Sequence, residues 1–309
     1  MPHSCCLQIR NLSTYFFTKP LIKAVRELDL ELHSGRTLAL VGESGCGKSM
    51  TALSILRLVP PPGRTVSGQI LLGSEDLLSL RQEEMQRIRG NRIAMIFQDP
   101  MTALNPVFTV GSQIIEVLRL HLGLTQLQAR DRAAELLHQV GMAAPHQRLS
   151  DYPHQLSGGM RQRAMIAMAL ACDPDILIAD EPTTALDVTI QAQIMALLSS
   201  LQQQRNMSLL LISHDLGIVA QHADQVAMMY DGMIVEQADT LALFDDPQHP
   251  YTRHLLTCIP GRRSANRPHA HIHSSEDFWQ QCPEAYRPLP TRLPPLQSVR
   301  TDHQVRRWS

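Results

Sequence analysis

Residues 42–49 read Gly-Glu-Ser-Gly-Cys-Gly-Lys-Ser and match G-x-x-x-x-G-K-[ST], the pattern of a phosphate-binding P-loop. The apolar run 37–41 before it is typical of a buried parallel strand, and residues 50–58 after it predict a helix. The glycines let backbone N–H groups turn inward, and the helix start adds positive partial charge. We therefore expect a nucleotide site in which Lys48 reaches the β- and γ-phosphates and Ser49 ligates Mg²⁺.

Composition excludes several other classes of protein. The net charge of −1 gives no overall attraction to nucleic acid or anionic lipid. No apolar run approaches the roughly 18–20 residues of a membrane span, and no signal peptide is visible, so we expect the chain in the cytosol. The six cysteines form no C-x-x-C pair, which indicates neither a disulfide framework nor a closed zinc site.

The order of patterns along the chain predicts the fold class. Residues 7–41 are rich in strand signals, whereas helical spacing dominates from about 101 to 156. Apolar strands follow at 175–179 and 208–212, and Asp231-Gly232 predicts a type I′ hairpin turn. We therefore expect an α/β P-loop core with an N-terminal antiparallel β region and an inserted helical subdomain at about 101–165.

The composition shifts after residue 260. Pro, Arg and His dominate residues 261–309, and periodicity is lost, so we expect a loosely ordered C-terminal extension. His269, His271 and His273 alternate and could bind Ni²⁺, Cu²⁺ or Zn²⁺ from one side of an extended strand. Incidental histidines in a solvated tail are the simpler interpretation.

A second nucleotide motif lies at residues 176–181, where an apolar strand ends in two carboxylates, Asp180 and Glu181. Ligands of α/β proteins bind at the carboxyl ends of such strands. Asp180 is expected to hold Mg²⁺ through water, and Glu181 to orient or deprotonate an attacking water.

Residues 156–163, Leu-Ser-Gly-Gly-Met-Arg-Gln-Arg, are similar to the signature motif of ATP-binding cassette (ABC) ATPases. A serine and two glycines that open a helix are also, by themselves, suited to bind an anion. The resemblance implies that Ser157, Gly158 and Gly159 face the P-loop of a partner subunit, with two ATP molecules held in a head-to-tail dimer.

Further elements of the ABC family match in order. Gln98 looks like the Q-loop glutamine, Asp187 the D-loop aspartate and His214 the switch histidine that contacts the γ-phosphate. Phe16 is our choice for the ring that stacks on adenine, although the adjacent Tyr15 also fits. The resemblance implies the catalytic residues Lys48, Gln98, Glu181 and His214 and the Mg²⁺ ligands Ser49, Gln98 and Asp180. It also implies ATP contacts from Phe16, Gly42, Glu43, Ser44, Gly45, Cys46, Gly47, Lys48, Ser49, Met50, Ser157, Gly158, Gly159 and Asp187.

Three segments resemble the oligopeptide/dipeptide/nickel importer branch of this family: residues 98–106, residues 179–189, and His249-Pro250-Tyr251-Thr252 with Leu255 and Leu256. The third alone could equally be a proline turn followed by a short helix. Some ATPases of dipeptide transporters carry four C-terminal cysteines that can hold an iron–sulfur cluster. Only Cys258 and Cys282 lie in that region here, so we expect no such cluster.

The resemblance implies an ABC ATPase domain at 1–260 that hydrolyses ATP with Mg²⁺ and powers peptide or nickel import. It would lie at the cytoplasmic face of the bacterial inner membrane. The implied partners are a second ATPase subunit (a copy or a paralogue), two membrane permease subunits and a periplasmic or lipid-anchored substrate-binding protein, without nucleic acid.

The main alternative is a soluble, non-transport ABC ATPase. Such proteins usually carry two cassettes or a long coiled coil, whereas this chain shows one cassette and no sustained heptads. A purely regulatory ATP-binding partner would show degenerate catalytic positions, and none is seen.

Overall fold

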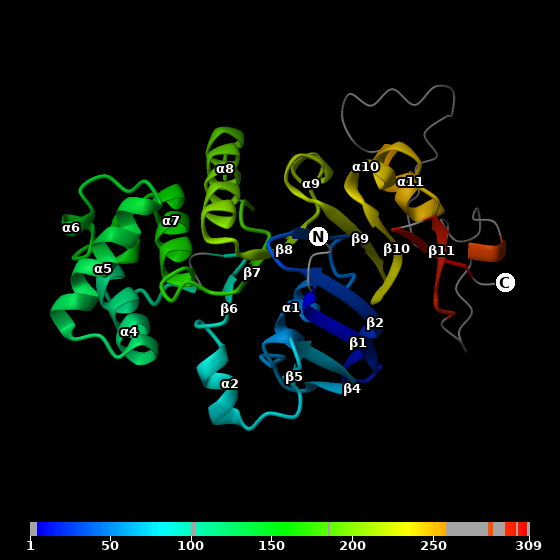
Figure 1. Cartoon of the computed structure of the whole chain (residues 1–309), viewed down its shortest axis with the longest axis horizontal. Coiled ribbons are helices and arrows are strands. Elements are labelled where there is room, and N and C mark those ends of the chain that lie inside the picture. Colours follow the sequence, from blue (N-terminus) through cyan, green and yellow to red (C-terminus); the bar gives the residue numbers. More distant parts are fainter. Residues whose placement is uncertain are drawn as a thin grey trace.

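The computed structural model describes residues 5–99, 103–184, 186–257, 284–286, 294–300 and 302–307. A helical region lies at one end of the long axis, a large sheet at the centre, and α10, α11 and β11 at the other end (Figure 1). The core helices are α1 (Lys48–Ile55), α2 (Gln82–Ile88), α8 (Val188–Arg205), α9 (Leu216–His222), α10 (Thr240–Asp245) and α11 (Pro250–Thr257).

The central sheet has the strand order β11-β12-β10-β9-β3-β8-β7-β6. Five neighbouring strands from β9 to β6 are parallel, and all of β3 is buried. Leu38 and Leu40 of β3 pack with α1, whereas Ala39 and Val41 pack with α9, which explains why this strand is a continuous apolar run. The strands are β3 (Thr37–Val41), β6 (Ile93–Ile96), β7 (Ile176–Asp180), β8 (Ser208–Ser213), β9 (Gln225–Tyr230), β10 (Met233–Asp239), β11 (Leu296–Arg300) and β12 (His303–Arg306).

A second sheet is antiparallel throughout, with the order β2-β1-β4-β5. Its inward residues share one core with α1 and with β3 and β8 of the central sheet. The prediction of an α/β core with an N-terminal antiparallel region is therefore confirmed. The strands are β1 (Cys5–Phe16), β2 (Ile22–His33), β4 (Gly63–Leu72) and β5 (Glu75–Asp76).

Two helices of the helical region, α4 and α5, start at residues whose side chains cap them. The Thr109 side chain accepts from Ser112 N–H at the start of α4, and Thr125 forms a capping box with Gln128 at the start of α5. The apolar stripes of these helices pack with α7 into one core. The region comprises α4 (Val110–Leu122), α5 (Gln126–Gln139), α6 (Pro145–Arg148), the 3₁₀ turn η1 (Pro153–Gln155) and α7 (Gly158–Ala169).

The predicted hairpin at Asp231-Gly232 is confirmed, because both residues have positive φ, 44° and 80°, as a type I′ turn requires. The extension differs from the expectation of a loosely ordered tail. There β12 pairs with β10 and with β11, so residues 296–300 and 303–306 extend the central sheet. His269, His271, His273, Cys258 and Cys282 lie outside the described residues.

The buried carboxylate of Glu236 on β10 explains the pairing of β12. Glu236 is 0% exposed, and its Oε1 lies 2.7 Å from Nε2 of His303 on β12. Backbone N–H groups of Gln248 and His249 donate to the same carboxylate. Since these partners are polar, hydrophobic periodicity gave no signal for β12. Among the described residues, no helix is long and apolar enough to cross a membrane.

The buried His249 should make the stability of the protein depend on pH. Burial, followed by the charges of Arg253 and Arg306, lowers the pKa of His249 from 6.5 to about 3. The ring therefore stays neutral in the folded protein, whereas the unfolded chain takes up a proton below pH 6.5, so stability falls as the pH falls from 6.5 towards 3.

We expect the free energy of unfolding to fall by about 2 kcal/mol more between pH 7 and pH 5 in the wild type than in His249→Asn. Asparagine can still accept the Tyr251 N–H that the histidine Nδ1 accepts at 3.1 Å. Urea unfolding of both proteins at the two pH values measures this, and an equal pH dependence would refute the assignment.

Candidate functional site

The P-loop joins β3 to α1 and is packed so closely that glycine is required at two positions. Gly47 has φ 109°, and a Cβ there would lie 2.2 Å from the carbonyl oxygen of Ala24. A Cβ on Gly42 would lie 2.2 Å from the carbonyl oxygen of Met229. The loop is thus fixed against the backbones of β2 and β9, and α1 starts directly behind it with its N–H groups available to an anion.

Lys48 lies over this loop and is only 5% exposed. Its Nζ donates to the carbonyl oxygens of Gly42, at 2.7 Å, and Glu43, at 2.8 Å. The ammonium group is therefore held at the mouth of the loop, where a phosphate would meet both the charge and the start of α1.

Ser49 and Asp180 form a pair suited to a magnesium ion. The Ser49 hydroxyl donates to Oδ1 of Asp180 at 3.1 Å, and Asp180 is 4% exposed at the end of β7. Burial, followed by the charge of Glu181, raises the pKa of Asp180 despite the bond from Ser49. A divalent cation would relieve this cost, and oxygen ligands are those that Mg²⁺ prefers, so these residues fit the ion.

Glu181, the residue after β7, adopts the left-handed conformation with φ 46°, which is uncommon for a residue with a side chain. Its backbone N–H donates to the carbonyl oxygen of Ile212 at 2.9 Å. Its side chain is 13% exposed and faces three neighbours: Gln98 Nε2 donates at 2.8 Å, the Thr184 hydroxyl donates at 3.0 Å, and His214 Nδ1 lies 3.1 Å away.

The electrostatic balance keeps this carboxylate ionised. Burial alone raises the pKa of Glu181, but the hydrogen bonds with His214 and Thr184 and the charge of Lys48 leave the pKa below its ordinary value. An ionised carboxylate can orient a water and accept its proton. His214 is 61% exposed, so its ring borders both the carboxylate and solvent.

The register of the parallel strands brings these groups to one edge of the sheet. Val41, before the P-loop, pairs with Ser213, before His214, and Asp180 pairs with Ile212. Gln98 follows β6, the next strand along that edge. The structure thus brings together all the predicted catalytic residues and Mg²⁺ ligands, namely Lys48, Ser49, Gln98, Asp180, Glu181 and His214.

The predicted signature and D-loop residues form a separate surface at the starts of α7 and α8. Ser157 caps α7 by accepting from Met160 N–H, and Asp187 caps α8 by accepting from Ile190 N–H at 2.9 Å. A Cβ on Gly159 would lie 3.2 Å from Cγ2 of Ile190, so the two helix starts lie close together. Pro100, Met101, Thr102 and Ala185, also in the predicted motifs, lie outside the described residues.

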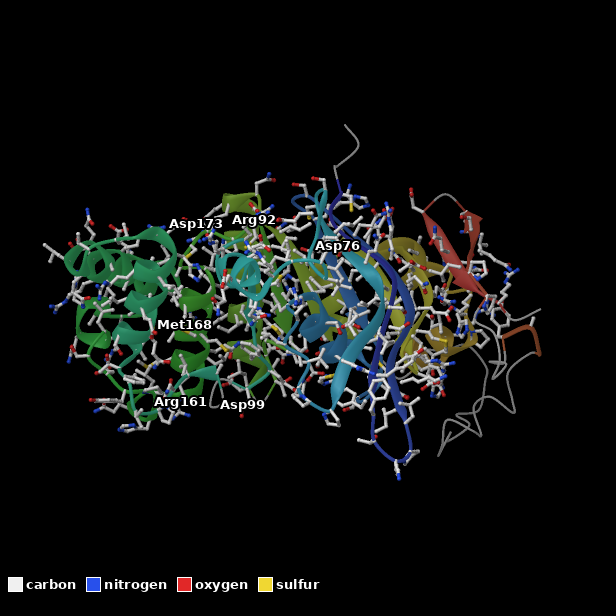
Figure 2. The ribbon with its side chains drawn as sticks, turned by 90° about the horizontal axis from the view of Figure 1, so that it is seen from below. Asp76, Arg92, Asp99, Arg161, Met168 and Asp173 are labelled. Atoms are coloured by element: carbon white, nitrogen blue, oxygen red, sulfur yellow. The ribbon has the colours of Figure 1, made fainter. Side chains whose placement is uncertain are left out.

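Helix α7 connects this surface to the edge that carries the predicted catalytic residues. Gln162 Nε2 donates to the carbonyl oxygen of Pro182, next to Glu181, at 2.6 Å. Figure 2 follows α7 from Arg161 through Met168, with Asp173 just beyond its end. Arg161 lies on the same side of the molecule as Asp99, the neighbour of Gln98.

Phe16 and Tyr15, the two candidates for the adenine ring, lie at the end of β1 and have different neighbours. The Thr14 hydroxyl lies 2.8 Å from the Ser54 hydroxyl of α1, so Thr14 faces the helix that follows the P-loop. Phe16 is two residues further along β1 and shares that face. The Tyr15 ring contacts Lys23, whose Nζ lies 5.7 Å from the ring centroid.

Two contacts of the site were missed from the sequence. The Thr184 hydroxyl binds the Glu181 carboxylate, and the Tyr251 hydroxyl accepts from the backbone N–H of Glu43 at 3.0 Å. Thr184 lies in a matched segment without an assigned role. Tyr251 is distant in sequence from the P-loop, and no local pattern could have connected them.

Two family models match the chain. The family model "ABC transporter" matches residues 25–184, and the model "Oligopeptide/dipeptide transporter, C-terminal region" matches residues 235–285. The probable peptide ABC transporter ATP-binding protein y4tR of Sinorhizobium fredii is 46% identical over 98% of this chain and 94% of its own length. The oligopeptide transport ATP-binding protein AppD of Bacillus subtilis is 54% identical over 83% of this chain and 79% of its own.

Among solved structures, the ATP-binding cassette MJ0796, a dimer in a post-hydrolysis state bound to ADP and Pi, superimposes with a TM-score of 0.68. It is 26% identical, over 76% of this chain and 98% of the cassette.

The left-handed backbone at Glu181 predicts an unusual order of stabilities. Glu181→Ala and Glu181→Gly both lack the carboxylate, but glycine adopts positive φ without a steric cost. The glycine variant should be more stable than the alanine variant by about 1 kcal/mol, the reverse of their order in a helix or strand. Urea unfolding compares the two, and a more stable alanine variant would show that this backbone is not strained.

Proposed function

Because this chain belongs to the ABC transporter family of ATP-binding proteins, and to its oligopeptide/dipeptide branch, we propose that it is the ATP-hydrolysing subunit that powers import of di- or oligopeptides. The observation that carries the proposal is the single edge on which the Ser49–Asp180 pair and the Glu181–Gln98–His214 cluster meet the P-loop. The C-terminal match at 235–285 supports the peptide branch.

In the proposed reaction, the P-loop N–H groups and Lys48 bind the phosphates, and Phe16 stacks on the adenine. Ser49, Gln98 and Asp180 hold Mg²⁺, which neutralises phosphate charge when it is bound. Glu181 orients the attacking water and accepts its proton, and His214 contacts the γ-phosphate. The six polar side chains in these roles are each already held by a neighbour, so little reorganisation is needed as charge develops.

The signature surface acts on a second subunit. Ser157, Gly158, Gly159 and Asp187 complete the nucleotide site of the partner ATPase in a head-to-tail dimer. ATP binding closes the two subunits, and hydrolysis reopens them. The hydrogen bond from Gln162 to Pro182 supports this coupling, because a movement of α7 would displace the residue next to Glu181.

The loop after Gln98 is the proposed docking site for a membrane permease. Val107 and Phe108 in this loop are 71% and 54% exposed, which is unusual for adjacent large apolar residues and is typical of a binding surface. Two permease subunits, a second ATPase subunit that is a copy or a paralogue, and a periplasmic or lipid-anchored substrate-binding protein complete the assembly. The chain then lies peripherally on the cytoplasmic face of the inner membrane.

The soluble, non-transport alternative is not favoured, since relatives across the length of the chain are named for peptide transport. Nickel stays open as an alternative cargo, because the substrate is selected by other chains of the assembly.

Replacement of the proposed base separates binding from hydrolysis. Glu181→Gln keeps the size of the side chain and its bonding capacity but cannot accept a proton, so ATP should bind and trap the dimer while turnover falls by at least about 100-fold. Phosphate release and gel filtration with MgATP measure the two effects. Wild-type turnover in a homogeneous preparation would exclude Glu181 as the base.

Transport itself is tested in a host strain that lacks this chain. Complementation with the wild type should restore uptake of labelled di- and oligopeptides, whereas Glu181→Gln should not. Uptake of ⁶³Ni²⁺ is measured in parallel. If complementation restored the uptake of nickel but not of peptides, nickel would be the cargo. If complementation changed neither uptake, an import function would be contradicted.

A further inference from the structure

Tyr251 contacts the P-loop from a distant part of the chain. It lies at the start of α11, is 2% exposed, and packs edge-on against Tyr230 with ring centroids 4.9 Å apart. Its hydroxyl accepts from the backbone N–H of Glu43 at 3.0 Å. Burial is the main cause that raises the pKa of the Tyr251 hydroxyl, so it stays protonated at any physiological pH.

The peptide unit between Gly42 and Glu43 is held at both ends. Its N–H donates to Tyr251, and its carbonyl oxygen accepts from Lys48 Nζ at 2.7 Å. In a trans peptide these two groups point in opposite directions. The orientation of this peptide plane therefore determines where the Gly42 carbonyl oxygen lies. That oxygen is one of the two carbonyl oxygens that hold the Lys48 ammonium group.

The position of Tyr251 is itself fixed by the buried Glu236 cluster. Tyr251 N–H donates to Nδ1 of His249, and His249 N–H donates to the Glu236 carboxylate. His303 of the C-terminal strand β12 binds the other oxygen of that carboxylate. A continuous series of short contacts thus runs from β12 to the P-loop.

We propose that Tyr251 is a positioning residue for ATP binding, which orients the Gly42–Glu43 peptide and thereby aims Lys48 at the phosphates. This inference rests on the proposed function, because it concerns the same nucleotide site. It assigns to α11, which lies in the match to the C-terminal transporter region at 235–285, a direct part in setting the affinity for ATP. In this proposal Tyr251 acts through the Gly42–Glu43 peptide and Lys48, and not on the nucleotide itself.

The test is Tyr251→Phe, which keeps the buried ring and removes only the hydroxyl. Loss of one such hydrogen bond should raise the Kd and the KM for MgATP about three- to ten-fold. The kcat should stay within about twofold, because the variant keeps Lys48 and the other predicted catalytic side chains and saturating ATP offsets the weaker binding. Titration with a fluorescent ATP analogue and steady-state ATPase assays measure the three quantities.

Tyr286→Phe is the matched control. Its ring also packs against this cluster, with the centroid 5.3 Å from that of His249, and the change removes a hydroxyl from the same region. ATP affinity should be unchanged in this variant. A fall in Tm with unaltered ATP affinity in Tyr251→Phe would give the hydroxyl a purely structural role and overturn the proposal, as would equal effects of the two changes.

A double-mutant cycle tests the route through Lys48. In a Lys48→Ala background, Tyr251→Phe should have no further effect on the Kd for the analogue. Additive effects would exclude Lys48 as the intermediary. A wild-type protein that binds ATP without hydrolysing it would contradict the proposed function while leaving this comparison of affinities intact.

Discussion

The parallel pairing of β3, β8 and β7 is the constraint on which the rest of the structure depends. Their register sets Val41 beside Ser213 and Asp180 beside Ile212, so that the P-loop, the two carboxylates and His214 all begin at the same edge of the sheet. No other element has to bring these groups together. A shift of one residue in any of the three strands would turn its buried side chains to the opposite face and separate the groups.

The Glu181 carboxylate connects this edge to the part of the molecule that we expect to move. Gln98, which precedes the helical region, binds one oxygen, and His214 lies against the other. The next residue along the chain, Pro182, accepts a hydrogen bond from Gln162 of α7. A backbone held at φ 46° by these partners is an example of strain retained where the chemistry takes place. Reorientation of the helical region would therefore alter the contacts of Glu181, the residue that we propose activates water.

Motifs that lie within a few residues of sequence could be predicted. The P-loop, the apolar strand before Asp180 and the type I′ turn at Asp231-Gly232 each depend on local backbone chemistry. Contacts between distant segments could not be predicted, since β12 is joined to β10 by a buried Glu236–His303 pair rather than by an apolar pattern. For the same reason Tyr251 could be recognised only as part of the segment at 249–256 that resembles the importer branch. Under the proposed function the cargo is selected by other subunits, so the sequence of this chain does not identify it.

We propose above that this ATPase works as part of a membrane-bound importer. The most direct measurement is an affinity pull-down of the chain from detergent-solubilised membranes of its host, with mass spectrometry of the proteins that accompany it. We expect to recover two permease subunits together with an ATPase partner, which is either a paralogue or a second copy of this chain. Recovery only from the soluble fraction, with ribosomal or DNA-repair proteins as partners, would contradict the transport function. Only the assignment as an ATPase would then stand.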